Sequence, residues 1–293
     1  MAEADAPRTY RGNCHCGAFV YEVEIPEIKS VFECNCSVCA KKGYLYLFPG
    51  RKNFKVVKGS EDALTQYRFG SMELVHGFCP TCATPLLGTK DIGPEEFHLA
   101  INVHTIQGLN TWELERTPFD GLAMGEPYQV PVHAGEVPSV EAEGDKTYTG
   151  SCHCGALTVA VASKPLDETY EGAVECNCSI CERIGAIWIY PMKERVVLSS
   201  ADEASMGRYS FKRDVNFINK TFCKICGITM TNSFLDLSSE QLAAMGPEGS
   251  EAYSYHSKKH PVNARVLNGL DLSKLQRTKF DGWNKVPGTY ANP

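Results

Sequence analysis

Short runs of alternating apolar and polar side chains dominate this 293-residue chain. The clearest run covers residues 19–25, where Phe19, Tyr21, Val23 and Ile25 occupy every second position, and residues 157–161 repeat it. Alternation with a period of two predicts strands with one buried and one exposed face. Further strands are expected at residues 44–48, 97–103, 187–190 and 215–222, and no long helix is expected. The pattern therefore predicts a mainly β fold.

The cysteines show that the chain is an internal duplication. Its 14 cysteines form two ordered sets of seven. The sets are Cys14, Cys16, Cys34, Cys36, Cys39, Cys79 and Cys82, and then Cys152, Cys154, Cys176, Cys178, Cys181, Cys223 and Cys226. Neighbouring residues follow the same register, because Gly-Xaa-Cys-His-Cys-Gly-Ala occurs at 12–18 and 150–156, and Glu-Cys-Asn-Cys-Ser-Xaa-Cys at 33–39 and 175–181. Each repeat is long enough to be a domain.

The repeats set the expected domain boundaries. Residues 8–126 are predicted to form the first domain and residues 146–293 the second. Residues 127–145, rich in Pro, Gly and Glu, are predicted to be a linker. The second repeat carries an insertion around residues 237–260, in which Ser238 and Gln241 predict a capped short helix that ends at Gly246–Pro247.

Composition narrows the classes of protein. A hydrophobic content of 43% supports real cores, and a formal net charge of -6 argues against a nucleic-acid partner. No secretion signal and no membrane-spanning stretch is recognised, so a cytoplasmic location is expected, with the nucleus as the alternative. Because a reducing compartment disfavours structural disulfides, the cysteines indicate metal binding.

The spacing predicts two zinc sites per repeat, and so four zinc ions per chain. Four thiolates close a structural site, whereas three leave a position open for a ligand. The closed, structural sites are assigned to Cys14, Cys16, Cys79 and Cys82, and to Cys152, Cys154, Cys223 and Cys226. The open, catalytic sites are assigned to Cys34, Cys36 and Cys39, and to Cys176, Cys178 and Cys181.

Other interpretations of these sites remain open at this point. A histidine ligand would complete the set of Cys34, Cys36 and Cys39 and make it a second structural site. The candidates are His76, His98 and His104. Asp120 and Asp281, in the repeated Phe-Asp-Gly, are either catalytic acids or turn residues. An iron–sulfur cluster would leave three cysteines of each repeat unexplained.

These motifs resemble the glutathione-dependent formaldehyde-activating enzyme family, also called the centromere-protein-V-like family. The resemblance rests on Gly-Xaa-Cys-His-Cys-Gly-Ala, Cys-Asn-Cys-Ser-Xaa-Cys, Phe-Cys-Xaa-Xaa-Cys and Phe-Asp-Gly. It implies two Mss4-like zinc domains in tandem, each with small β-sheets around one closed and one open zinc. It also implies carbon–sulfur lyase activity on a thiol adduct of a small carbonyl or metabolite, with glutathione as co-substrate. The alternative is a non-catalytic zinc module for protein or chromatin interaction.

The two repeats depart from the family pattern in different places. The first keeps His76, where Lys220 aligns in the second repeat. The second keeps Trp283 directly after Phe-Asp-Gly, where the first has Leu122. One open site is therefore expected to be impaired, or the tandem domains are expected to act as an internal pseudo-dimer in which each lends a wall to the other's pocket.

Overall fold

The computed structural model describes residues 6–140, 142–211, 218–286 and 290–293. Its internal contacts divide the chain into two compact units. One unit consists of Met1–Gln129 with Ser179–Gly185 and Tyr290–Pro293, and the other of Val130–Cys178 with Ala186–Thr289. Part of the expected strand at 215–222, residues 215–217, lies outside the described residues.

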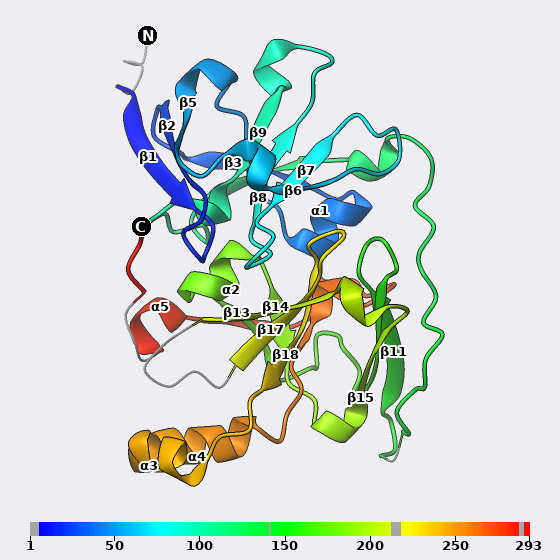
Figure 1. The fold of residues 1–293 in the computed structure, drawn as a ribbon. Helices are drawn as coiled ribbons and strands as arrows, with labels where there is room; N and C mark the ends of the chain where they lie inside the picture. Colours follow the sequence, from blue (N-terminus) through cyan, green and yellow to red (C-terminus); the bar gives the residue numbers. More distant parts are fainter. Residues whose placement is uncertain (1–5, 141, 212–217, 287–289) are drawn as a thin grey trace. The chain divides into compact units, whose positions relative to one another are not determined.

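The first repeat folds into two sheets (Figure 1). The three-stranded sheet has the order β1-β2-β5, with β1 at Arg8–Asn13, β2 at Val20–Ile25 and β5 at Phe54–Lys58. The seven-stranded sheet has the order β10-β3-β4-β9-β8-β7-β6. Its strands are β3 Ser30–Cys34, β4 Tyr46–Leu47, β6 Thr65–Tyr67, β7 Val75–Phe78, β8 Pro85–Thr89, β9 Leu99–Asn102 and β10 Glu115–Phe119. The mainly β prediction is confirmed.

The second repeat has the same topology. Its small sheet is β11-β12-β15, and its large sheet, read from the matching edge, is β20-β13-β14-β19-β18-β17-β16. The strands are β11 Lys146–Ser151, β12 Leu157–Ser163, β13 Ala173–Cys176, β14 Ile187–Ile189, β15 Val196–Ser200, β16 Met206–Ser210, β17 Ile218–Cys223, β18 Thr229–Phe234, β19 Val262–Asn263 and β20 Arg277–Phe280.

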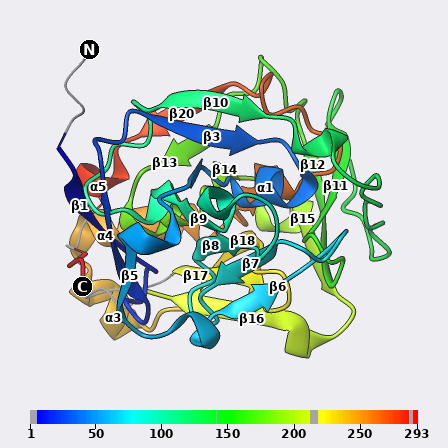
Figure 2. The same ribbon diagram turned by 90° about the horizontal axis from the view of Figure 1, so that it is seen from above.

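One pairing in each large sheet brings distant parts of the chain together. The late strand β10 runs parallel to the early strand β3 (Figure 2). In this register Phe119 lies opposite Cys34. In the second repeat β20 runs parallel to β13, and Phe280 lies opposite Cys176. The other pairings in both large sheets are antiparallel. This parallel pairing carries each Phe-Asp-Gly to the end of the strand that precedes the three cysteines.

The strand at residues 157–161 differs from its expected half-exposed pattern. Every residue of β12 is buried, whereas β2 keeps Glu24 exposed. The physical reason is composition, because Thr158, Ala160 and Ala162 are small enough for a position covered on both faces. Alternation identified the strand correctly, but it did not reveal that both faces are covered.

The helices are short, and the longest is α4 in the insertion of the second repeat, with 11 residues. The helices are α1 Ser37–Lys42, α2 Ser179–Arg183, α3 Ser239–Ala244, α4 Gly246–His256 and α5 Gly282–Lys285. Single turns of 3-10 helix lie at Arg51–Asn53, Glu61–Ala63, Glu95–Phe97, Val103–Thr105, Gly121–Ala123, Lys193–Arg195, Glu203–Ser205 and Ala264–Val266. Among the described residues, no helix is both long enough and apolar enough to cross a lipid bilayer.

The insertion confirms the predicted helix and adds a second one. The Ser238 side chain accepts a hydrogen bond from the Gln241 backbone N–H, and the Gln241 side chain accepts one from the Ser238 backbone N–H. These two bonds form the expected capping box of α3. The helix ends at Ala244, before Gly246–Pro247, as expected, but a second helix that was not expected, α4, begins at Gly246 and is 11 residues long. Proline is well suited to the first turn of a helix because that position needs no amide hydrogen bond. The same dipeptide therefore ends one helix and begins the next.

His260, at the end of this insertion, makes the second repeat sensitive to acid. Its Nε2 is buried and has no hydrogen-bond partner among the described residues, and burial lowers the pKa of His260 to about 4, with Lys193 adding to the effect. The folded state therefore binds fewer protons than the unfolded state between about pH 6.5 and pH 4, so stability falls as the pH drops through this window.

We expect the unfolding free energy to fall by about 1 kcal/mol more in wild type than in H260Q between pH 7 and pH 5.5. Denaturant titrations monitored by tryptophan fluorescence in a W112F background measure this, because Trp188 and Trp283 then report on the second repeat. Equal pH dependence in both proteins would contradict the expectation.

Candidate metal centres

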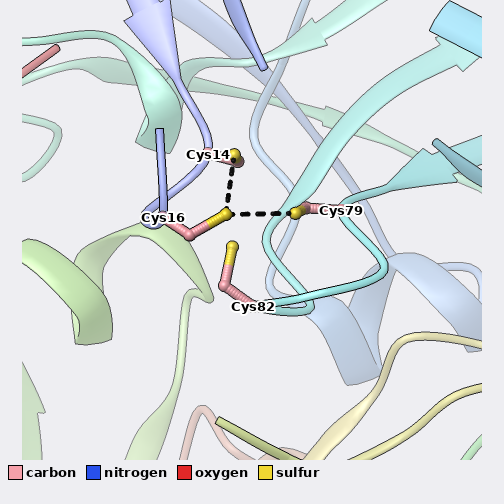
Figure 3. Close-up of side chains that lie close together, drawn as sticks. All are labelled: Cys14, Cys16, Cys79 and Cys82. Carbon is pink, nitrogen blue, oxygen red and sulfur yellow. Dashed lines mark hydrogen bonds between the residues drawn. The ribbon is translucent and has the colours of Figure 1, made fainter. Parts of the chain in front are cut away.

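The first four-cysteine cluster joins two loops of the first repeat (Figure 3). Cys14 and Cys16 follow β1, whereas Cys79 and Cys82 lie in the turn between β7 and β8. The Sγ of Cys16 lies 3.5 Å from that of Cys14 and 3.5 Å from that of Cys79, and all four sulfurs lie within 4.8 Å of one another. The residues assigned to the closed site are thus brought together.

The second repeat builds the same cluster from Cys152, Cys154, Cys223 and Cys226. The Cys154 sulfur lies 3.6 Å from that of Cys152 and 3.5 Å from that of Cys223. Four sulfurs at about 2.3 Å from a central zinc ion would be about 3.8 Å apart in a tetrahedron. Since the observed spacings are close to this value and all these thiols are free, both clusters fit a zinc ion.

The turns around these ligands have the backbone conformation that the sequence indicates. Gly17, Gly155 and Gly227 have positive φ angles of 71°, 82° and 71°. Ala83 takes the place of Gly227 in the first repeat and adopts a φ of 56°. A left-handed alanine is strained, because its Cβ approaches the following carbonyl. The first repeat keeps this turn despite the strain, and Ala83 donates its N–H to the Cys79 carbonyl at 2.9 Å.

Hydrogen bonds to sulfur favour a thiolate at Cys82 of the first closed cluster, whereas sulfur neighbours and burial raise the pKa of Cys14, Cys16 and Cys79. Backbone N–H groups donate to Cys14 Sγ at 3.3 Å and to Cys152 Sγ at 3.2 Å. Burial raises the pKa of Cys82, but hydrogen bonds from the three other cysteines outweigh it and hold that pKa well below its ordinary value. A set of sulfurs that already stabilises a thiolate is suited to bind a cation.

Each three-cysteine cluster lies where a strand ends and a short helix begins. Cys34 ends β3, Cys36 is the N-cap of α1, and Cys39 lies in its first turn. The Cys36 backbone N–H donates to Cys34 Sγ at 3.4 Å, and Cys178 donates to Cys176 Sγ at 3.3 Å in the second repeat. Hydrogen bonds from Cys36 and Cys39 lower the pKa of Cys34 to about 3, so this cluster also stabilises a thiolate.

Gly121 covers the first three-cysteine cluster without a side chain. A Cβ on Gly121 would lie 2.5 Å from Cys34 Sγ and 2.8 Å from the Cβ of Cys36. The Gly121 backbone N–H also hydrogen-bonds the Cys34 sulfur and lowers its pKa further. Gly282 has the same relation to Cys176 Sγ, again at 2.5 Å. Only glycine allows the backbone to approach the sulfur this closely.

An asparagine between the cysteines holds this glycine in place. Asn35 Nδ2 donates to Asp120 Oδ1 at 2.9 Å, and the Leu122 backbone N–H donates to Asn35 Oδ1 at 2.9 Å. In the second repeat Asn177 makes the matching bonds to Asp281 and Trp283, at 3.1 and 3.0 Å.

These bonds give both aspartates a positioning role. Hydrogen bonds from Asn284 and Asn177 lower the pKa of Asp281, so it remains ionised and holds the turn rather than acting as an acid. The roles of Asn35 and Gly121 were not recognised from the sequence. The signal that could have found them is that Cys-Asn-Cys and Phe-Asp-Gly recur together in both repeats.

Aromatic side chains form one wall of the first three-cysteine cluster. Tyr44 and Tyr46 are buried in one apolar cluster with Cys39, against which Cys34 and Cys36 also pack. Phe48, Tyr67 and Phe69 extend this cluster as partly buried members. The wall keeps water away from one side of the sulfurs, so electrostatic interactions there are stronger than at the surface.

Histidine does not complete the first three-cysteine cluster. Among the described residues, the group whose ligand atoms lie within 4.8 Å of one another contains Cys34, Cys36 and Cys39 and no further His, Asp or Glu. His76 Nδ1 instead hydrogen-bonds the Tyr46 hydroxyl at 3.2 Å, and His98 Nε2 hydrogen-bonds the Gly93 carbonyl at 3.0 Å. The second cluster likewise contains only its three cysteines.

The four clusters predict the metal content. We expect zinc-loaded protein to hold four zinc ions per chain, one for each cluster. Metal analysis after gel filtration against a weak chelator should give this ratio. Two ions per chain would show that one type of cluster does not bind zinc.

Comparison with known proteins places the chain in a family. The family model described as glutathione-dependent formaldehyde-activating enzyme matches residues 9–115 and again residues 147–247. A crystal structure of a Rhodobacter sphaeroides protein is 32% identical, in an alignment that covers 36% of this chain and 99% of that chain with a TM-score of 0.32. The two family segments, with two cysteine clusters in each repeat, show that the chain belongs to the glutathione-dependent formaldehyde-activating enzyme family and carries its domain twice in tandem.

Proposed function

We propose that the protein is a zinc-dependent carbon–sulfur lyase for adducts of glutathione, or another thiol, with a small carbonyl or metabolite. One observation carries the proposal. Each repeat has three thiol ligands grouped within 4.8 Å, and among the described residues no fourth His, Asp or Glu joins them. A three-thiolate zinc site leaves one position for an exogenous ligand. The family description supports the same assignment.

The reaction needs a sulfur leaving group and a route for one proton. In an S-hydroxymethyl adduct the carbon–sulfur bond breaks with both electrons on sulfur, while the hydroxyl loses its proton and becomes a carbonyl. A zinc ion held by Cys34, Cys36 and Cys39 would stabilise the sulfur as a thiolate. Gly121 places its backbone against the Cys34 sulfur on one side, and the buried Tyr44 and Tyr46 form an apolar wall beside Cys39 on which we propose that the carbon half packs.

Proton NMR tests this function directly. Zinc-loaded protein is mixed with formaldehyde and glutathione, and exchange between the S-hydroxymethyl adduct and free formaldehyde hydrate is measured. We expect the exchange rate to rise in proportion to protein concentration. The matched control is the double variant C36S/C178S, which keeps all ligands of both closed clusters. This variant should show only the rate of exchange measured without protein.

The alternative is a non-catalytic zinc module for protein or chromatin interaction. Protein with four zinc ions per chain that accelerates no thiol adduct, whether of glutathione, cysteine or a smaller thiol, would overturn the lyase proposal and favour that module.

A further inference from the structure

The segment Tyr290–Pro293 follows the Phe-Asp-Gly of the second repeat in sequence, but it belongs to the compact unit that contains the first repeat. That unit also includes Ser179–Gly185, which carries α2. Within the unit, the segment lies against the loop Cys14–Cys16, which supplies two of the four sulfurs of the first four-cysteine cluster. Its contacts there bear on how this cluster retains a metal ion.

Tyr290 contacts the residue that separates the two ligands of this loop. Its ring stacks on the imidazole of His15, with a centroid distance of 4.7 Å and an interplanar angle of 22°. Its hydroxyl donates to the His15 carbonyl at 2.8 Å and accepts from Asn13 Nδ2 at 2.8 Å. Asn13 Nδ2 also donates to the Cys14 carbonyl at 2.8 Å. One side chain thus holds both sequence neighbours of Cys14.

Pro293 is anchored at the other end of the segment. Its carbonyl accepts hydrogen bonds from Arg11 Nε at 3.0 Å and from Gln107 Nε2 at 3.2 Å. Its ring lies over Gly17, where a Cβ would be 3.2 Å from Pro293 Cγ. Gly17 directly follows the ligand Cys16 and has a φ of 71°. The segment therefore contacts the loop on both sides of its ligand pair.

The buried Arg183 of α2 joins the segment to the loop. Its guanidinium lies 4.9 Å from the centre of the Tyr290 ring, and its Nη2 donates to Asn292 Oδ1 at 2.8 Å. The same guanidinium donates through Nε to the Asn13 carbonyl and through Nη2 to Asn13 Oδ1, both at 3.1 Å. A buried charge needs its hydrogen-bond partners, so displacing the loop from Arg183 is unfavourable.

The other compact unit shows the same packing of a proline on a glycine. Tyr-Xaa-Xaa-Pro occurs at residues 128–131 and 290–293, each time after a Phe-Asp-Gly. Pro131 belongs to the unit that contains most of the second repeat. In that unit a Cβ on Gly155, the counterpart of Gly17, would lie 3.0 Å from Pro131 Cβ, and Asn268 Nδ2 donates to the Pro131 carbonyl at 3.4 Å. The proline of each segment therefore packs on the glycine after the Cys-His-Cys of the other repeat.

We infer that the Tyr290–Pro293 segment holds the Cys14–Cys16 loop closed and so slows the loss of zinc from the first four-cysteine cluster. Zinc can leave when this loop moves its two sulfurs away from the other two ligands. Such local openings have their own free energy, and each contact that must break raises it. One zinc ion of the first repeat is thus retained by residues that follow the second repeat in sequence. The inference does not depend on the lyase function proposed above.

Pulsed alkylation measures zinc loss at each cluster separately. Zinc-loaded full-length protein is incubated with N-ethylmaleimide and excess EDTA, and peptide mass mapping gives the rate at which each cysteine is modified. We expect Cys79 and Cys82 to be modified about 10- to 100-fold faster in Y290A, the range by which residues outside the ligand set change metal affinity. Both cysteines are buried in the turn between β7 and β8, so their modification reports loss of the ion rather than exposure of the loop.

The second four-cysteine cluster is the internal control, since Cys223 and Cys226 should be modified at the same rate in Y290A and in wild type. The control variant is A291S, which changes an exposed residue of the same segment and should keep all wild-type rates. Y290F keeps the ring but removes the hydroxyl, so its rate should lie between those of wild type and Y290A. Unchanged rates at Cys79 and Cys82 in Y290A, or equal acceleration at both four-cysteine clusters, would overturn the inference.

Discussion

We expect C82S to unfold the first repeat, whereas C36S leaves it folded and removes one weakly held zinc ion. Cys82 is buried in a cluster that joins the loop after β1 to the turn between β7 and β8. A structural zinc contributes about 10 to 16 kcal/mol of binding free energy, and this becomes folding free energy when the ligands are apart in the unfolded chain. Because a whole domain is stable by only about 5 to 15 kcal/mol, losing this site removes most of its stability.

Cys36 differs because its cluster is local. Cys34, Cys36 and Cys39 lie within six residues of one another. Because β3 and α1 already fix this short segment, a bound metal adds little further constraint to the chain. Differential scanning calorimetry and metal analysis on C82S, C36S and the matched pair C226S and C178S measure both effects. An equal fall in melting temperature for the two classes would show that the assignment of closed and open sites is wrong.

The grouping of cysteines could be predicted from sequence because it depends on short spacings. A Cys-Xaa-Xaa-Cys turn brings two sulfurs close together whatever the rest of the fold does. Because the same seven cysteines occur in both repeats, they can be divided into ligand sets of four and three in only a few ways. The positive φ angles of Gly17 and Gly155 and the capping box at Ser238 follow from equally local rules. The structure groups the sulfurs into the same four sets.

The covering of the three-cysteine clusters could not be predicted in this way. Phe119 pairs with Cys34 across 85 residues of chain, and a parallel pairing of that length has no local signature. Phe-Asp-Gly therefore indicated a turn, although its glycine is the residue that lies against the sulfur. The exchange of His76 for Lys220 was visible in the sequence, but only the sheet register showed that each side chain has its Tyr46 or Trp188 neighbour.

The close approach of Gly121 gives the second large effect. We expect G121A to weaken zinc binding at the first three-cysteine cluster on the order of 100-fold, because outer residues that orient ligands contribute this much to affinity. Gly121 begins a turn of 3-10 helix, a conformation that alanine adopts readily, so the effect is steric rather than conformational. The added Cβ would lie 2.5 Å from Cys34 Sγ, and either the sulfur or the turn that carries Asp120 must move.

Competition with a chromophoric chelator measures the affinity of the most weakly held ions in G121A, in G282A and in the control L122A. Leu122 is 63% exposed and donates to Asn35 only through its backbone, so L122A should keep the wild-type affinity within about twofold. G282A should weaken zinc binding at the second three-cysteine cluster to the same extent, since a Cβ on Gly282 would lie at the same distance from Cys176 Sγ. Wild-type zinc affinity in both glycine variants would contradict this expectation. It would mean that neither three-cysteine cluster depends on the close approach of its Phe-Asp-Gly backbone to hold zinc.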